Sequence, residues 1–152
     1  MNNLALKCFL ILRDLFFDEL GSPKLFPLRE KRHTQDDPFD EFIAHALTAH
    51  LPEYGAICQE ASGPLISPDM VVYRNGVDFG SESVENNPDE IFGIEVKKLE
   101  RKNGRIARRT GLDYNSTPPC GRIRVYTPQE SELIIKGFYL FACLEQDPSS
   151  LY

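Results

Sequence analysis

Residues 67–97 read SPDMVVYRNGVDFGSESVENNPDEIFGIEVK, and this stretch decides the fold of the chain. Its two ends, DMVVYR at residues 69–74 and IFGIEVK at residues 91–97, are short, rich in β-branched and aromatic residues, and typical of strands. Asn75 and Gly76 are a turn signal directly after the first end, and residues 80–88 are polar, as in a loop. The stretch therefore predicts two strands joined by an excursion of the chain.

Helical periodicity dominates the sequence before this stretch. Apolar residues from Asn3 to Leu20 recur at helical spacing, and Gly21, Ser22 and Pro23 are expected to end that helix. A second helix is expected to start at a cap on Asp36 or Asp37, with Pro38 in its first turn, and to end at Pro52. Its expected buried stripe comprises Phe39, Phe42, Ile43, Ala46 and Leu47.

Strand patterns dominate the rest of the chain. Residues 54–60 predict a short strand before the deciding stretch, and residues 123–126 predict another after it. The apolar run ELIIKGFYLFAC at residues 132–143 fits a long strand or a helix, and Gly137 favours the strand. Helices first and strands later predict an α/β or α+β sheet with helices packed on it.

The length of 152 residues predicts a single domain. We divide it into an N-terminal helix and connector at residues 1–34 and a core at residues 35–152. Little sequence follows the last apolar run to cover its face. Three explanations stay open: a chain truncated at its C-terminus, a compact member of its class, or a subunit whose core a partner completes.

Composition favours a soluble cytoplasmic protein. The chain is 41% hydrophobic and has no apolar run of the length a membrane helix needs. Its first apolar stretch lacks a basic leader and a small-residue cleavage site, so we expect no secretory signal. Its four cysteines lie far apart without a CxxC pair, which favours reduced, mostly buried thiols. We therefore expect no membrane partner.

Charge is distributed unevenly along the chain. Residues 97–124 contain nine Lys and Arg against two acidic residues, a net charge of +7, whereas the remaining residues carry −13. A concentrated basic segment on an acidic body can bind a polyanion such as nucleic acid. A solvated, charged linker is the alternative explanation for the same segment.

Acidic side chains mark both strands of the deciding stretch. Because side chains alternate along a strand, Glu95 and Lys97 are expected to point the same way, with Val96 in the core. If the two strands pair, Asp69 lies beside Glu95, and two carboxylates there make an all-oxygen site suited to Mg²⁺. The Lys97 ammonium would then act on the attacking water or on a scissile phosphate.

This pattern resembles the PD-(D/E)XK nuclease signature, with Pro68-Asp69 followed by Glu95-Val96-Lys97. The segment GLDYNSTPPCGRIRVY at residues 111–126 is also similar to segments of type II restriction endonucleases, the NgoPII-like group being nearest. The resemblance spans residues 60–143 and implies a restriction-endonuclease-like core, a central mixed β-sheet flanked by helices. Restriction enzymes of this class usually run well beyond 152 residues.

The resemblance implies a Mg²⁺-dependent enzyme that hydrolyses phosphodiester bonds of double-stranded DNA at a specific sequence, leaving a 5′-phosphate and a 3′-hydroxyl. Asp69 and Glu95 would bind the metal, and Lys97 would be the catalytic lysine. Glu41 or Glu60 would add an auxiliary acid. A homodimer that reads a palindrome, a companion DNA methyltransferase and a prokaryotic cytoplasm are implied as well.

Basic and polar residues after Lys97 supply the expected DNA contacts, because Arg and Asn can read base edges and Ser and Thr can reach bases or phosphates. The expected DNA-binding residues are Arg101, Lys102, Arg105, Arg108, Arg109, Asn115, Ser116, Thr117 and Arg122.

Two further interpretations of the chain stay open. The chain can be a non-catalytic DNA-binding or assembly module that keeps the nuclease fold, or an acidic scaffold without a nucleic-acid role. The structural explanation of the motif is an Asp69 that caps a strand and a surface pair of Glu95 and Lys97. In the scaffold, the basic segment would be a solvated loop.

Overall fold

The computed structural model describes residues 3–24, 38–60, 68–102, 105–108, 121–126 and 132–145. The helices are α1 (Leu4–Phe16) and α2 (Pro38–His50), with the short 3₁₀ helices η1 (Leu51–Tyr54) and η2 (Val84–Asn86). The strands are β1 (Ala56–Glu60), β2 (Met70–Arg74), β3 (Ile91–Lys102), β4 (Arg105–Arg108), β5 (Arg122–Tyr126) and β6 (Glu132–Glu145). The order of helices and then strands along the chain is the expected one.

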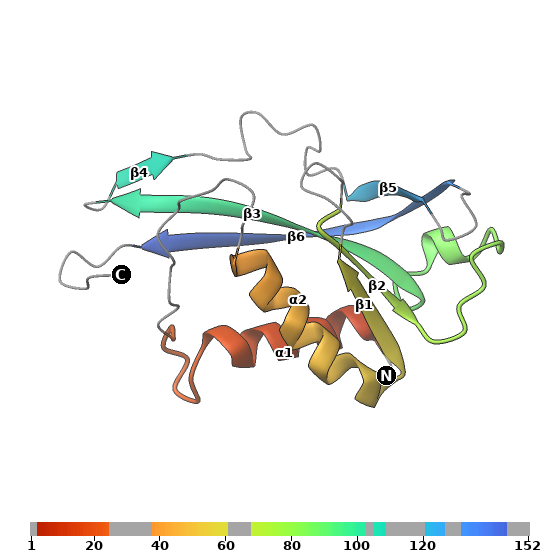
Figure 1. Ribbon diagram of the computed structural model, residues 1–152, viewed down its shortest axis with the longest axis horizontal. Coiled ribbons are helices and arrows are strands. Elements are labelled where there is room, and N and C mark those ends of the chain that lie inside the picture. Colours follow the sequence, from red (N-terminus) through yellow and green to blue (C-terminus); the bar gives the residue numbers. More distant parts are fainter. Residues whose placement is uncertain are drawn as a thin grey trace.

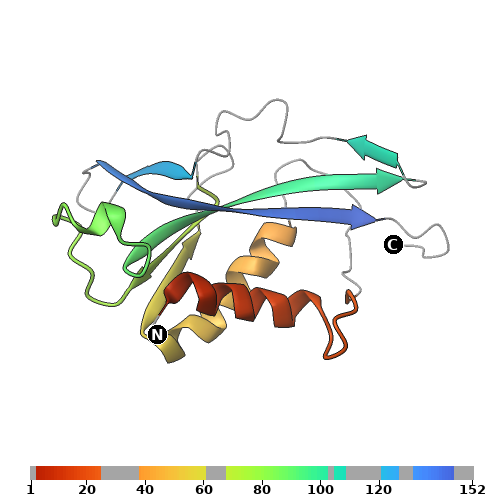
Figure 2. The same ribbon diagram turned by 180° about the vertical axis from the view of Figure 1, so that it is seen from behind.

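The described strands form one mixed sheet in the order β1-β2-β3-β6-β5, and β4 pairs with the far end of β3 (Figure 1). β1, β2 and β3 are successive antiparallel neighbours, β3 and β6 are parallel, and β5 is antiparallel to β6. Both α-helices lie on the same face of this sheet (Figures 1 and 2). The α+β class is therefore confirmed, with its described α-helices on one face rather than flanking the sheet.

Helix α1 is shorter than the sequence predicts. Asn3 caps it, because its side chain accepts a hydrogen bond from the Leu6 N–H at 3.0 Å. The helix ends at Phe16 instead of Leu20, since the chain turns back through Gly21, at φ 79°, and Phe17 bridges to Pro23. Its buried face comprises Leu4, Cys8 and Leu12.

Helix α2 begins at Pro38, and the predicted cap at residues 36–37 falls outside the described residues, as does the connector up to residue 34. Its buried residues are Phe39, Ile43, Ala44 and Leu47. The predicted stripe was wrong at Phe42, which is exposed and rests against the Phe16 ring of α1, and at Ala46, which is half-buried. The buried stripe of α2 is thus shifted toward Ala44 relative to the prediction.

The strand β3 is longer than predicted and changes the interpretation of the basic segment. It continues past Lys97 to Lys102, and β4 returns along it as an antiparallel partner. The first part of the basic segment is therefore strand rather than linker. The long apolar run near the end of the sequence is the strand β6, as Gly137 indicated.

Two apolar cores cover the two faces of the sheet. The larger core joins α1 and α2 to the sheet through residues such as Ile43, Met70 and Ile94. The smaller core, on the other face, contains Ile123 and Ile135. Each core uses alternate residues of the same strands, which is how a sheet that is buried on both faces must be built.

Burial also governs the two cysteines of the larger core. Cys8 and Cys58 are free and buried, as expected for reduced thiols. Burial raises the pKa of each thiol to about 12. Cys120 lies outside the described residues.

No described helix has the combination of length and apolar character that crossing a bilayer requires.

Two glycines make room for one side chain in the smaller core. Gly93 of β3 and Gly137 of β6 are direct partners in the parallel register. A Cβ at Gly137 would lie 2.7 Å from both Cγ1 and Cδ1 of Ile123, and a Cβ at Gly93 would lie 3.3 Å from Cδ1. The Ile123 side chain therefore fills the space at Gly137 and shares the space at Gly93 with Pro68, whose Cγ would lie 3.1 Å from a Cβ there. This packing holds β5 against the β3–β6 pair.

We predict that Gly137→Ala destabilises the protein by about 1–3 kcal/mol, because the new methyl group overlaps the Ile123 side chain. Urea unfolding followed by circular dichroism measures this loss. Gly80→Ala is the matched control, since its Cβ would meet only an Asp78 oxygen at 3.4 Å, and we expect it to change stability by about 0.5 kcal/mol or less. A Gly137→Ala loss of the same size in an Ile123→Ala background would contradict the assigned overlap.

Candidate active site

The strands β2 and β3 part just before Met70, and Asp69 lies at the point of parting. Met70 faces Ile94 in the last antiparallel pair of the described ladder. Beyond it, Asp69 Oδ2 accepts a hydrogen bond from the Val96 N–H at 2.6 Å. Pro68, the preceding residue, has no N–H with which to extend the ladder. The Asp69 carboxylate thus replaces a backbone acceptor and is fixed against β3.

Glu95 and Lys97 flank Val96 and lie on the opposite face of β3 from it, as the strand alternation predicts. Val96 belongs to the larger core, whereas the exposed fractions of Glu95 and Lys97 are only 6% and 1%. Lys97 Nζ lies 3.6 Å from Glu95 Oε1. This is an ion-pair distance but longer than a charge-assisted hydrogen bond.

The ammonium of Lys97 has no hydrogen-bond acceptor in the described structure. A buried cation is costly unless its charge is paired and its N–H groups are satisfied. Glu95 supplies the opposite charge without satisfying those N–H groups. Lys97 is therefore a buried cation whose charge is paired with Glu95 but whose N–H groups have no acceptor among the described residues.

Asp40, in the first turn of α2, belongs to the same charged group. Its Oδ1 atom is buried and has no hydrogen-bond partner in the described structure. Burial raises its pKa to about 7, and the negative charges of Asp69, Glu95 and Glu60 add to the rise. The helix α2 therefore brings a third carboxylate into electrostatic reach of the two on the sheet.

Opposing effects act on the pKa of the Asp69 carboxyl. Burial raises its pKa to about 6, the Val96 N–H acts in the opposite direction, Glu95 raises it and Lys97 lowers it. Negative charge thus exceeds positive charge around Lys97. A cation placed among these carboxylates would relieve that excess.

Asp40 is not one of the acids expected from the sequence, whereas its neighbour Glu41 is. Glu41 is exposed and lies 3.8 Å from His45 Nε2, one turn along the same helix. Asp40 precedes the buried Ala44 by four residues, so it falls on the buried face of α2. The helical spacing of this acid from the buried residues of α2 was the signal in the sequence that could have identified it. Glu60 is exposed at the end of β1 and contributes only its charge.

The chemistry of the donors fits Mg²⁺, a hard cation that takes oxygen ligands. Among the described side chains, no three of His, Cys, Asp or Glu converge closely enough to hold a metal ion. Mg²⁺ usually keeps several waters and needs only one or two protein carboxylates. The fit rests on the excess negative charge and on the orphaned Asp40 Oδ1.

Of the residues expected to contact DNA, the structure places some near the pair on β3 and others elsewhere. The backbone of Arg101 and Lys102 continues β3 beyond Lys97, and Arg105 and Arg108 lie on β4 beside it. Arg122 lies on β5 and donates a hydrogen bond to Asn86 Oδ1 at 3.2 Å. The remaining expected residues, Arg109, Asn115, Ser116 and Thr117, lie outside the described residues.

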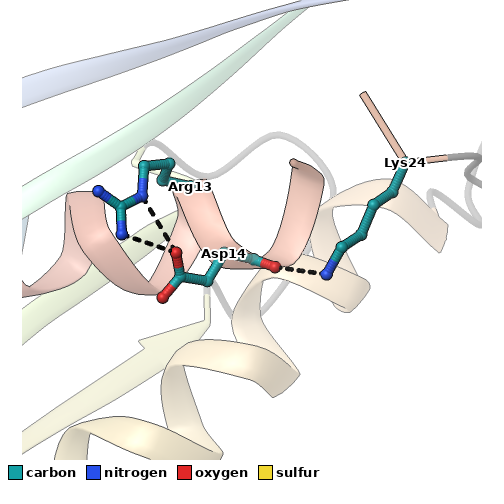
Figure 3. A network of polar contacts seen from close by, with 3 residues as sticks. All are labelled: Arg13, Asp14 and Lys24. Carbon is teal, nitrogen blue, oxygen red and sulfur yellow. Dashed lines mark hydrogen bonds and ion pairs between the residues drawn. The ribbon is translucent and has the colours of Figure 1, made fainter. Parts of the chain in front are cut away.

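A cleft of about 270 Å³ lies elsewhere, between α1 and the end of α2. Two of its charged residues, Asp14 and Lys7, are already engaged. Asp14 accepts two hydrogen bonds from Arg13, and the Asp14 backbone carbonyl accepts one from Lys24 at 2.7 Å (Figure 3). Lys7 Nζ lies over the Tyr54 ring, 4.9 Å from its centre. The β2–β3 parting, with its unsatisfied buried groups, is the better candidate for chemistry.

Comparison of the chain with known protein families, with curated proteins and with solved structures found no match.

We predict that Asp40→Asn stabilises the metal-free protein at pH 8 by an amount on the order of 1–4 kcal/mol. A raised carboxyl pKa means that the folded state holds its proton more tightly than the unfolded state does. The stability that the proton provides is therefore lost as pH rises from about 4 to about 7. Asn cannot ionise, so the difference between variant and wild type should grow across that window and vanish below it.

Thermal unfolding at a series of pH values measures this difference. Glu41→Gln, one residue away but exposed, is the matched control and should leave stability nearly unchanged. An Asp40→Asn protein that is less stable than wild type at pH 8 would refute the electrostatic coupling.

Proposed function

We propose that the protein is a Mg²⁺-dependent deoxyribonuclease, a type II restriction endonuclease that hydrolyses phosphodiester bonds of double-stranded DNA. The observation that carries the proposal is the buried Glu95–Lys97 pair, set beside an Asp69 carboxylate that is fixed where β2 and β3 part. Two acids and a lysine in this order also form the motif that resembles the PD-(D/E)XK signature.

In this proposal Asp69 and Glu95 hold the metal, and Asp40 from α2 adds negative charge to it. Bound Mg²⁺ would lower the pKa of the attacking water and would offset negative charge at the phosphate. The Asp69 oxygen bonded to the Val96 N–H is committed to the backbone, which leaves its other oxygen as the candidate ligand.

Lys97 has the role of orienting water and stabilising the charge that develops as water attacks phosphorus. The attack forms a new P–O bond and breaks the bond to the 3′ oxygen, which leaves a 5′-phosphate and a 3′-hydroxyl. A buried ammonium acts more strongly than an exposed one, because less water screens its charge. The 1% exposure of Lys97 is suited to that role.

The basic arm formed by the end of β3 and by β4 supports DNA as the substrate. Five basic residues follow Lys97 along these two strands: Lys98, Arg101, Lys102, Arg105 and Arg108. They begin at the residue next to the pair, where the backbone phosphates of a substrate would continue. A homodimer and a companion methyltransferase belong to the same proposal.

A non-catalytic DNA-binding module is the second candidate. It is favoured by the contacts of the three motif residues, because the hydrogen bond from Val96 to Asp69 and the ion pair of Glu95 with Lys97 would also suit purely structural roles. Such a module would bind DNA in EDTA as well as in Mg²⁺, and it would never cleave it.

We predict discrete Mg²⁺-dependent fragments when the protein is incubated with unmethylated phage-type DNA and resolved on a gel. Asp69→Asn and Lys97→Met should each lower the cleavage rate by about 10²-fold or more. Asn keeps an oxygen that can accept the Val96 hydrogen bond, so its loss of activity would report charge rather than folding. Glu41→Gln should cleave like wild type.

Binding in EDTA, followed by mobility shift, separates the two candidates. Retained binding by both variants together with lost cleavage supports the nuclease. Cleavage by Lys97→Met at the wild-type rate would eliminate the assignment of this lysine, and a metal-independent shift without any cleavage would favour the binding module.

A further inference from the structure

We propose that Tyr139 and Phe141 of β6 form an aromatic ledge on which one unpaired nucleobase of the substrate stacks, beside the candidate active site. The inference rests on the proposed function and narrows its substrate. The strand that is cut would present a base that is out of the duplex stack at the cleavage position, either already unpaired or extruded by the protein.

Strand register brings the ledge to the site. In the parallel pairing of β3 with β6, Glu95 is the partner of Tyr139 and Lys97 is the partner of Phe141. Partners on neighbouring strands lie about 4.8 Å apart and point to the same face of the sheet. Tyr139 packs against the smaller core, on the face that lacks α1 and α2. The two rings therefore flank the charged pair along its whole length.

The two residues of the ledge differ in exposure. Tyr139 is half-buried, whereas 52% of Phe141 is exposed. Their ring centres lie 6.5 Å apart, and the ring planes are inclined by only 29°. Tyr139 thus supports Phe141 from one side and leaves an aromatic surface open next to a buried lysine.

The exposed group at this place is the Phe141 ring, because the Lys97 ammonium beside it is buried. The proposed function supplies the class of ligand, since a DNA substrate would reach the candidate site with its bases as well as its phosphates. A nucleotide carries both a phosphate and a planar base, and bases of every kind stack on aromatic side chains.

Stacking on the ledge requires a base whose face is free. Within a duplex, neighbouring base pairs cover both faces of each base, so an enzyme reaches one by using a single strand or by extruding it. Phe138, another exposed phenylalanine of β6, is not part of the ledge. It lies on the opposite face of the sheet, where its ring and the Phe92 ring meet edge to face at a centre distance of 5.1 Å.

The test measures binding to short DNA in EDTA, so that cleavage does not interfere. The probe is an oligonucleotide with one 2-aminopurine, whose fluorescence falls when the base stacks. It is used as a single strand, as a perfect duplex, and as a duplex in which that base is unpaired. We expect wild type to prefer the two forms with an unpaired base and to quench their fluorescence.

Variants of the ledge sharpen the test. Phe141→Ala should weaken binding of the unpaired forms by about 5- to 150-fold and abolish the quenching. Phe141→Leu, which keeps apolar bulk without a π face, should lose the quenching too, and Phe141→Tyr should restore it. Phe9→Ala, on α1 with 61% exposure, is the matched control and should bind like wild type.

An abasic nucleotide at the probe position gives an independent check. The abasic nucleotide should weaken probe binding by wild type and should not weaken binding by Phe141→Ala any further, because both changes remove the same contact. Equal affinity of Phe141→Leu and wild type, or equal binding of the paired and unpaired probes, would overturn the ledge.

Mg²⁺-dependent cleavage by wild type, measured in parallel, keeps the two proposals apart. Cleavage with unchanged probe binding by Phe141→Ala overturns the ledge alone. A wild-type protein that binds no DNA and cleaves none overturns the ledge and the proposed function together.

Discussion

One charge-assisted hydrogen bond, from the Val96 N–H to Asp69 Oδ2, holds the place where β2 leaves β3. Because Val96 lies between Glu95 and Lys97 in the sequence, fixing its N–H also fixes the Asp69 carboxylate relative to both charged neighbours. The helix-side core anchors the same region, since Val96 packs into it from the opposite face of β3. The arrangement of charge at this point thus depends on a backbone contact rather than on contacts between flexible side chains.

The charges gathered at this point do not balance in the protein alone. Glu95 pairs with a buried ammonium, and burial raises the pKa of Asp40 to about 7, with the negative charges of Asp69, Glu95 and Glu60 adding to the rise. A fold selected for stability alone would replace such a group with apolar side chains of similar volume, which is often neutral or stabilising. Retained imbalance of this kind is typical of sites that await a cation or a charged substrate.

Local patterns in the sequence predicted most of the elements, because helix and strand periodicity depend on near neighbours. The position of Asp69 before β2 and the alternation of Glu95 with Lys97 followed from the same patterns. The extension of β3 to Lys102 did not, since it depends on pairing with β6 and β4. Asp40 was missed for a similar reason: only the packing of α2 against the sheet determines that this acid is half-buried, with its Oδ1 atom out of contact with solvent, whereas Glu41 is exposed.

The parallel pairing of β3 with β6 also has a consequence for how the molecule folds. β1, β2 and β3 are antiparallel neighbours that are close in sequence, whereas Phe92 and its partner Lys136 are 44 positions apart. Closing so long a loop costs entropy before any contact rewards it, so β6 is expected to dock late, after the three-stranded meander has formed. The Asp69–Val96 hydrogen bond is then expected to form before β6 docks. A nascent chain therefore acquires its charged centre before the aromatic residues of β6 pack beside it.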